Sequence, residues 1–370
     1  MTGIGIDVQR TSLRIVIAEP VDETLAHHNV TDGARRQIPM LVAADGSWGS
    51  AAASNAESAS GAGSVAFWRG LYQRLQDHLG GLRPDPRDGC RLTFAVEAGM
   101  RDEGTSRSAI LDAAGYERVR TIDPADAVLS ACLAGHANAL GAERILVGVA
   151  VGEEAVQVRG VMIGGGRVVA ATDGVTIDGV GHGFWRDHLY ALLSDRAPEF
   201  ERGTARLAVN DSIAQFAERL SLAHANEEVA WRGAGSQMLF APMMVTQRDA
   251  RTWPRVRIIE SALPEAVRAA ITQLGTADAV VGIGGIGSIW PFARASLAHV
   301  ATVLSDHSPI DMVARGASLP MLTGHHDHGA RTDVPQPAAP VPEQRSRRES
   351  VPPWLRKPGV LTSDERDADA

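Results

Sequence analysis

Short apolar runs rich in β-branched residues alternate with longer segments of helical periodicity along most of this chain. In the first half, the runs GIGIDV and SLRIVIAE predict two strands that a tight turn joins into a hairpin. The strands predicted in this half lie at residues 3–8, 12–19, 38–43, 91–96 and 117–122, and the helices at 64–79, 103–115 and 123–137. The mixture of strands and helices is typical of an α/β protein.

The order strand, strand, strand, helix, strand, helix recurs in the second half. The predicted strands lie at residues 143–151, 153–163, 166–174, 279–283 and 299–304, and the predicted helices at 180–193, 212–222, 261–275, 288–298 and 309–322. This repetition predicts two lobes, residues 1–140 and 141–323. Residues 324–370 are polar and without periodicity, so we expect a disordered tail there.

Composition narrows the class of protein. The chain has 370 residues, 44% of them hydrophobic, and a net charge of -8, which suits a large core and does not favour nucleic-acid binding. Its two cysteines, Cys90 and Cys132, favour neither a disulfide framework nor a cysteine metal site. No run of apolar residues is long enough to span a bilayer, and we expect a cytoplasmic location without a membrane span.

The most informative stretch is the glycine-rich turn in VVGIGGIGSIWPFA. An apolar strand leads into Gly284, Gly285 and Gly287, and Ser288 opens the predicted helix, so bare amide groups are available for an anion or a nucleotide. A tight turn without a ligand is the plainer interpretation. The spacing also fits a dinucleotide-binding motif with Asp306 as the ribose acid, but such a fold needs more strands downstream than this chain offers.

The sequence around this turn resembles that of the actin, hexokinase and DnaK-type heat-shock ATPase superfamily. GGIGSIWPFA followed by SPIDMVARGAS is similar to the heat-shock sequences GGSTRIPKV and NPDEAVAYGAA. The resemblance implies a duplicated two-lobed actin-like (ribonuclease H-like) fold with a central nucleotide cleft, closest to the heat-shock nucleotide-binding domain. It also implies that Gly284, Gly285, Gly287 and Ser288 contact the adenosine of ATP or ADP.

The first hairpin resembles the first phosphate loop of that superfamily, GIDLGTTNS. The resemblance implies that Asp7 acts in catalysis by helping to hold the water shell of a magnesium ion, and that Thr11 and Ser12 surround the phosphates. Gln9 and Arg10 depart from the pattern, and Arg10 supplies a charge where the family has a glycine. Taken alone, Asp7 is also a common kind of turn cap.

Two further catalytic positions follow from the resemblance. Arg69 stands near the place of the family's catalytic lysine, and Asp123 stands where a glutamate positions the attacking water. Each residue also has a plainer interpretation, because Arg69 suits a solvated helix face and Asp123 suits a helix N-cap before Pro124.

The second phosphate loop departs furthest from the family. ILVFDLGGGTFDV corresponds here to ILVGVAVGEEAVQ, in which Val149 replaces the acid, Gly152 is the glycine that remains, and Glu153 and Glu154 follow it. Two carboxylates beside a triphosphate repel it by on the order of several kcal/mol per close pair. We therefore expect a lost phosphate site.

The helix expected to face the base is also altered. At residues 212–222 the family's charged contacts become Ala214 and Ala217, and Ser221 alone matches. In the tail, His325, His326, Asp327 and His328 form a weak metal motif. Ser350 and the region around Trp354 suggest a modification or protein-interaction motif.

These features favour a degenerate, weakly or non-hydrolysing nucleotide-binding or scaffold protein, a pseudo-ATPase that acts through protein partners. The alternatives are an active ATP-binding chaperone-like ATPase and, third, a dinucleotide-binding enzyme.

Overall fold

The computed structural model describes the chain from Met1 to Leu319 with several gaps. The described residues are 1–21, 24–33, 35–53, 56–58, 62–85, 89–97, 110–116, 119–136, 143–165, 167–194, 203–232, 242–275, 277–304, 306 and 308–319. The chain divides after residue 324, and all the described residues lie before that point. The predictions for the tail, including those for His325, Ser350 and Trp354, lie outside the described residues, as does most of the helix expected at 103–115.

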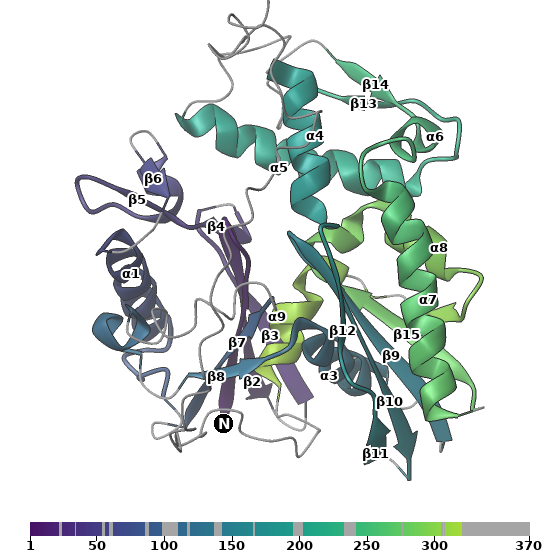
Figure 1. Ribbon diagram of the computed structural model, residues 1–370. Coiled ribbons are helices and arrows are strands. Elements are labelled where there is room, and N and C mark those ends of the chain that lie inside the picture. The colour runs from purple at the N-terminus through teal and green to yellow at the C-terminus, as the bar shows by residue number, and fades with distance from the viewer. Residues whose placement is uncertain are drawn as a thin grey trace, which may run out of the picture. The chain divides into compact units, whose positions relative to one another are not determined.

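The first sheet has the strand order β3-β2-β1-β7-β8 (Figure 1). Its strands are β1 (Thr2–Val8), β2 (Ser12–Val21), β3 (Thr24–Val30), β7 (Cys90–Val96) and β8 (Arg120–Ile122), and β4 (Gln37–Pro39) pairs with β2 beside this path. Strands β1, β2 and β3 are antiparallel neighbours, whereas β1, β7 and β8 run parallel. Helix α1 (Ala62–His78) packs its apolar side chains into the core of this sheet, and we call the assembly the first lobe.

The second sheet repeats this order as β11-β10-β9-β15-β16. Its strands are β9 (Glu143–Val151), β10 (Ala155–Gly164), β11 (Arg167–Ala171), β15 (Ala279–Gly284) and β16 (Thr302–Val303), and β12 (Val175–Asp178) pairs with β10 as β4 pairs with β2. The strand directions are also the same, with an antiparallel hairpin followed by parallel neighbours. The α/β class expected from the sequence is therefore confirmed.

Five helices and a two-stranded sheet complete what we call the second lobe. They are α4 (His182–Ser194), α5 (Gly203–Leu222), the one-turn α6 (Gln247–Ala250), α7 (Val256–Leu274) and α8 (Pro291–Leu297), with β13 (Val229–Trp231) and β14 (Met243–Val245). Helix α7 buries Ile259, Leu263 and Val267, which recur every four residues and so share one face. Several tryptophans, among them Trp185 of α4 and Trp290, lie in the core of this lobe.

Two helices cross between the lobes. Helix α3 (Pro124–His136) follows the first sheet but packs on β9 and β15, and α9 (Met312–Ser318) follows the second sheet but packs on β1 and β7. Glycines allow close backbone contact, since a Cβ at Gly316 would lie 1.7 Å from the Ala127 carbonyl oxygen and one at Gly5 1.9 Å from that of Ala314. The two helices therefore join the sheets through a core of their own.

Several boundaries differ from those expected. The third strand in the sequence is β3, and not residues 38–43 as expected. Residues 38–43 instead contribute to two short strands, β4 and β5 (Leu41–Ala43), on either side of Met40. Strand β5 pairs with β6 (Ala56–Ser58). Strand β12 was not among the strands predicted from the sequence. The helix expected to open at Ser288 begins at Pro291, because a short 3-10 helix occupies Ile286–Ile289 and proline suits the first turn of α8.

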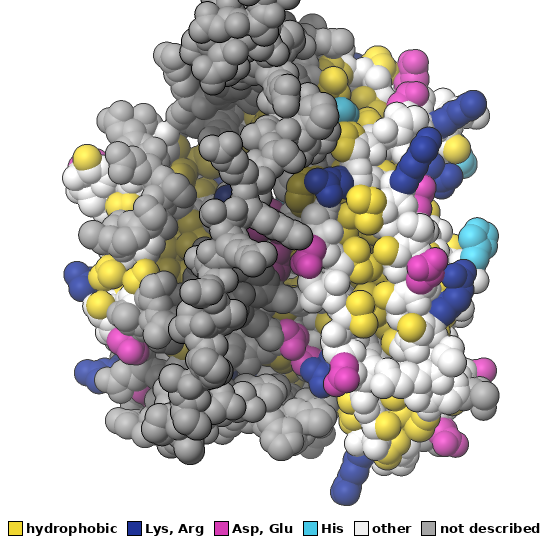
Figure 2. All heavy atoms as spheres, in the orientation of Figure 1, with side chains coloured by type: hydrophobic (Ala, Val, Ile, Leu, Met, Phe, Trp, Pro, Cys, Tyr) yellow, Lys and Arg dark blue, Asp and Glu magenta, His cyan; other side chains and the backbone are white. Residues whose placement is uncertain are grey.

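The surface carries mixed charge. On the face drawn in Figure 2, the described surface carries both basic and acidic side chains among apolar ones. Within the described part of the chain, no helix is both long and apolar enough to cross a bilayer.

Candidate functional site

The β1–β2 turn of the first lobe carries the residues expected to bind phosphate and metal. Asp7 is buried near the end of β1 and accepts a hydrogen bond of 3.1 Å from the Gln9 side chain. Burial raises the pKa of Asp7 to about 7, although the Arg14 guanidinium opposes this shift. Ser12 is also buried, and its hydroxyl accepts a hydrogen bond from Gln37.

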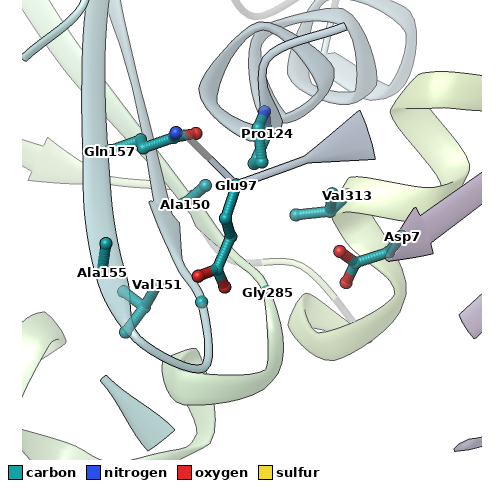
Figure 3. A pocket seen from close by; sticks show the side chains of 10 residues that line it. Asp7, Glu97, Pro124, Ala150, Val151, Ala155, Gln157, Gly285 and Val313 are labelled. Carbon is teal, nitrogen blue, oxygen red and sulfur yellow. The ribbon is translucent and has the colours of Figure 1, made fainter. Parts of the chain in front are cut away.

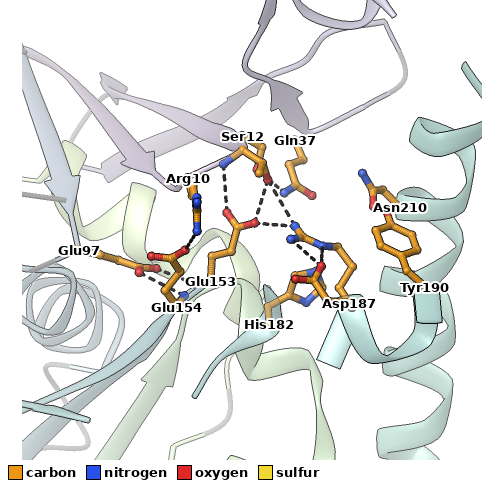
Figure 4. A network of polar contacts seen from close by, with 12 residues as sticks. Arg10, Ser12, Gln37, Glu97, Glu153, Glu154, His182, Asp187, Tyr190 and Asn210 are labelled. Atoms are coloured by element: carbon orange, nitrogen blue, oxygen red, sulfur yellow. Dashed lines mark hydrogen bonds and ion pairs between the residues drawn. The ribbon is translucent and has the colours of Figure 1, made fainter. Parts of the chain in front are cut away.

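The β9–β10 turn of the second lobe meets the first turn directly. The buried Glu153 carboxylate accepts the Thr11 N–H at 3.1 Å and the Thr11 hydroxyl at 2.9 Å. Arg186 of α4 reaches the same carboxylate at 2.5 Å. Figure 4 draws Glu153 within this network of polar contacts. Thr11 thus presents the donors expected for a phosphate, but a carboxylate of this chain accepts both.

Glu97 follows β7 and lies on the other side of the same turn. Its carboxyl group accepts the backbone N–H of Glu153 at 2.6 Å and that of Glu154 at 3.3 Å. Burial raises the pKa of Glu97 to about 8, and this outweighs the two amide hydrogen bonds, which act in the opposite direction. Glu97 was not among the residues predicted from the sequence.

A signal for Glu97 was present in the sequence. Strand β7 runs parallel to β1, with Ala95 opposite Asp7, so the residue after β7 reaches the same edge of the sheet as Asp7. An acid directly after a buried strand next to β1 was therefore a candidate for the cleft.

Ion pairs nearer the surface also join the lobes. The exposed Arg10 side chain bonds Glu154, and Arg35 bonds Asp211 of α5 at 2.7 Å. Arg10 therefore meets a carboxylate of this chain where the sequence analysis expected a phosphate.

The space between Asp7 and Glu97 is small. A cavity of about 10 Å³ is lined by both carboxyl groups, Pro124, Gln157 and Gly285 (Figure 3). This volume suits about one water molecule, whereas pockets for ligands of nucleotide size span roughly 300–1,000 Å³. This cavity is therefore too small to hold ATP or ADP. The Gln157 Oε1 atom is buried without a hydrogen-bond partner, so the cavity has a polar wall.

Protein atoms fill the space in front of the glycine-rich turn. A Cβ at Gly284 would lie 2.8 Å from Met312, one at Gly285 2.6 Å from the Val151 carbonyl oxygen, and one at Gly287 2.4 Å from the Val151 side chain. The Ser288 hydroxyl donates to the Gly285 carbonyl oxygen. These glycines let the end of β15 and the turn after it lie close to Val151 and Met312.

Three other predicted residues lie apart from this group or at its edge. Arg69 donates to the Ala113 carbonyl oxygen within the first lobe, and the exposed Ser221 donates to the Glu218 carbonyl oxygen of its own helix. Asp123 is half-buried directly before Pro124, at the edge of the cavity, where its carbonyl group accepts the Ala127 N–H.

Neither protein-family models nor the sequences of curated proteins match this chain. Among the described residues, no group of three or more histidine, cysteine or acidic side chains is placed to hold a metal ion. The function therefore has to be inferred from the geometry of the cleft.

Proposed function

We propose that this chain is a non-hydrolysing, actin-like scaffold of the heat-shock ATPase type, which acts through protein partners. Its two lobes are duplicates built on one strand order, and a partner sets how far they close. The chain keeps the two-lobed outline of the superfamily and has lost the groups that bind and hydrolyse the nucleotide.

The architecture supports the first half of this proposal. Each sheet has an antiparallel hairpin, then parallel strands, and each lobe ends in a helix that packs on the other lobe's sheet. Such an arrangement suits rotation of two lobes about a pair of crossing helices, which is a common form of domain closure.

The observation that carries the second half is the occupation of both turns by the chain's own carboxyl groups. Glu153 accepts the donors of Thr11, and Glu97 accepts the amides that follow Gly152. Phosphoryl transfer depends on such donors being free to position the phosphates and the metal. An acid has taken the place of each phosphate, so turnover is not expected.

A single-turnover assay with radiolabelled ATP and magnesium tests this proposal. Wild type is expected to release phosphate no faster than buffer, and no faster than Asp7→Ala. Magnesium-dependent turnover that disappears in Asp7→Ala would favour the alternative, an active chaperone-like ATPase. The observation that favours that alternative is Asp7 itself, which keeps the family's position and faces the cavity.

A further inference from the structure

Glu97 reaches from the first lobe into the second. Its side chain begins at the end of β7, and its carboxyl group ends at the amides of Glu153 and Glu154, in the β9–β10 turn (Figures 3 and 4). The residue is 5% exposed. Two backbone N–H groups on one buried carboxyl group make a specific contact, because every displaced partner would lose its hydrogen bond without water to replace it.

Gly152 provides the space for this contact. A Cβ at position 152 would lie 1.9 Å from Glu97 Oε1, closer than any two such atoms approach. Gly152 has an ordinary φ, because it is not among the glycines in the left-handed region. The absence of a side chain at Gly152 therefore serves Glu97, where the sequence analysis had assigned it to a phosphate.

At this point each lobe places a carboxyl group against hydrogen-bond donors of the other lobe. The first lobe supplies Glu97 to the amide of Glu153, and the second lobe supplies the Glu153 side chain to the amide and hydroxyl of Thr11. Arg186 adds a cation from the second lobe and also lies 3.4 Å from the Thr11 hydroxyl. Because Glu153 takes part through both its backbone and its side chain, a shift of its turn weakens both contacts together.

We infer that these reciprocal hydrogen bonds form an autoinhibitory clasp, made by Glu97, Gly152, Glu153 and Thr11. The clasp holds the cleft shut until a partner separates the lobes. The inference rests on the proposed function, since it names how that scaffold is kept closed. Opening the clasp exposes the turn amides of both lobes to solvent.

Amide hydrogen exchange, followed by mass spectrometry on the full chain at one pH, tests the clasp. Gly152→Ala displaces Glu97 without changing a charge, and the readout is Thr11, which lies in the opposite lobe. We expect Thr11 to exchange roughly tenfold faster in this variant, while α7 exchanges as in wild type. Gly174→Ala is the matched control, because a Cβ at Gly174 meets nothing within 4 Å, and it should leave Thr11 unchanged.

Unchanged exchange at Thr11 in Gly152→Ala, with faster exchange confined to the β9–β10 turn, would overturn the clasp. If α7 also exchanges faster, the variant has lost its fold, and Glu97→Ala then decides by the same readout. Faster exchange at Thr11 in Glu97→Ala supports the clasp, and wild-type exchange contradicts it. This outcome is independent of the turnover assay, so a failure of the clasp is distinguishable from a failure of the proposed function.

Discussion

At the scale of single residues, Glu97 and Asp7 link the cleft to pH. Burial raises their pKa values to about 8 and about 7, from ordinary values of 4.5 and 3.8. The folded protein holds these protons more tightly than the unfolded chain does. The free energy of unfolding therefore falls as pH rises through this range, and the loss is complete above the folded pKa values.

We predict that the melting temperature of wild type falls between about pH 6 and about pH 8.5, and that it falls less in Glu97→Gln, which cannot ionise. Differential scanning calorimetry at both pH values measures this. Glu218→Gln, an exposed change on α5, is the matched control and should follow wild type. Parallel curves for wild type and Glu97→Gln would show that burial does not raise the pKa of the Glu97 carboxyl group.

The buried ion pair of Arg14 with Asp311 is a second residue-scale test. The two side chains meet at 2.8 Å, each is 7% exposed, and Asp311 also accepts from Ser308 and Arg36. Asp311→Ala leaves the Arg14 charge buried and is expected to cost about 3–5 kcal/mol in chemical denaturation. The exposed Asp45→Ala should cost much less. Equal stabilities for the two variants would contradict this account.

At the scale of elements, the crossing helices depend on close backbone contact. Gly316→Ala places a Cβ against the Ala127 carbonyl oxygen, so we predict a loss of more than about 2 kcal/mol in unfolding free energy, measured by urea titration. Gly135→Ala in α3 is the matched control, since a Cβ there meets nothing within 4 Å. A Gly316→Ala variant as stable as Gly135→Ala would mean that α9 shifts freely on α3.

Elements with strong periodicity were predictable from the sequence, and the contents of the cleft were not. The β1–β2 hairpin, α1 and the repeated element order follow from apolar patterns, which report burial. The glycine-rich turn could not be interpreted from the sequence, because a glycine that contacts a ligand and a glycine that packs against Val151 look the same in the sequence. Glu153 was expected to repel a phosphate, but the pattern gave no sign that it bonds Thr11 from the other lobe.

At the scale of the whole molecule, residues 1–324 form a compact unit by themselves. We predict that a chain ending at Gly324 has the same melting temperature as the full chain, because residues 325–370 are polar and lack an apolar periodicity. Scanning calorimetry on both chains measures it. A shorter chain that melts many degrees lower would show that the tail stabilises the unit.

We propose that carboxyl groups of this chain occupy the places that phosphates take in the superfamily. Calorimetric titration of the full chain with ATP and magnesium tests this proposal most directly, with Glu153→Ala titrated in parallel. We expect no binding heat for wild type up to nucleotide concentrations of about 1 mM, because Glu153 holds the donors of Thr11. Saturable, magnesium-dependent binding to wild type at micromolar concentrations, unchanged in Glu153→Ala, would contradict it.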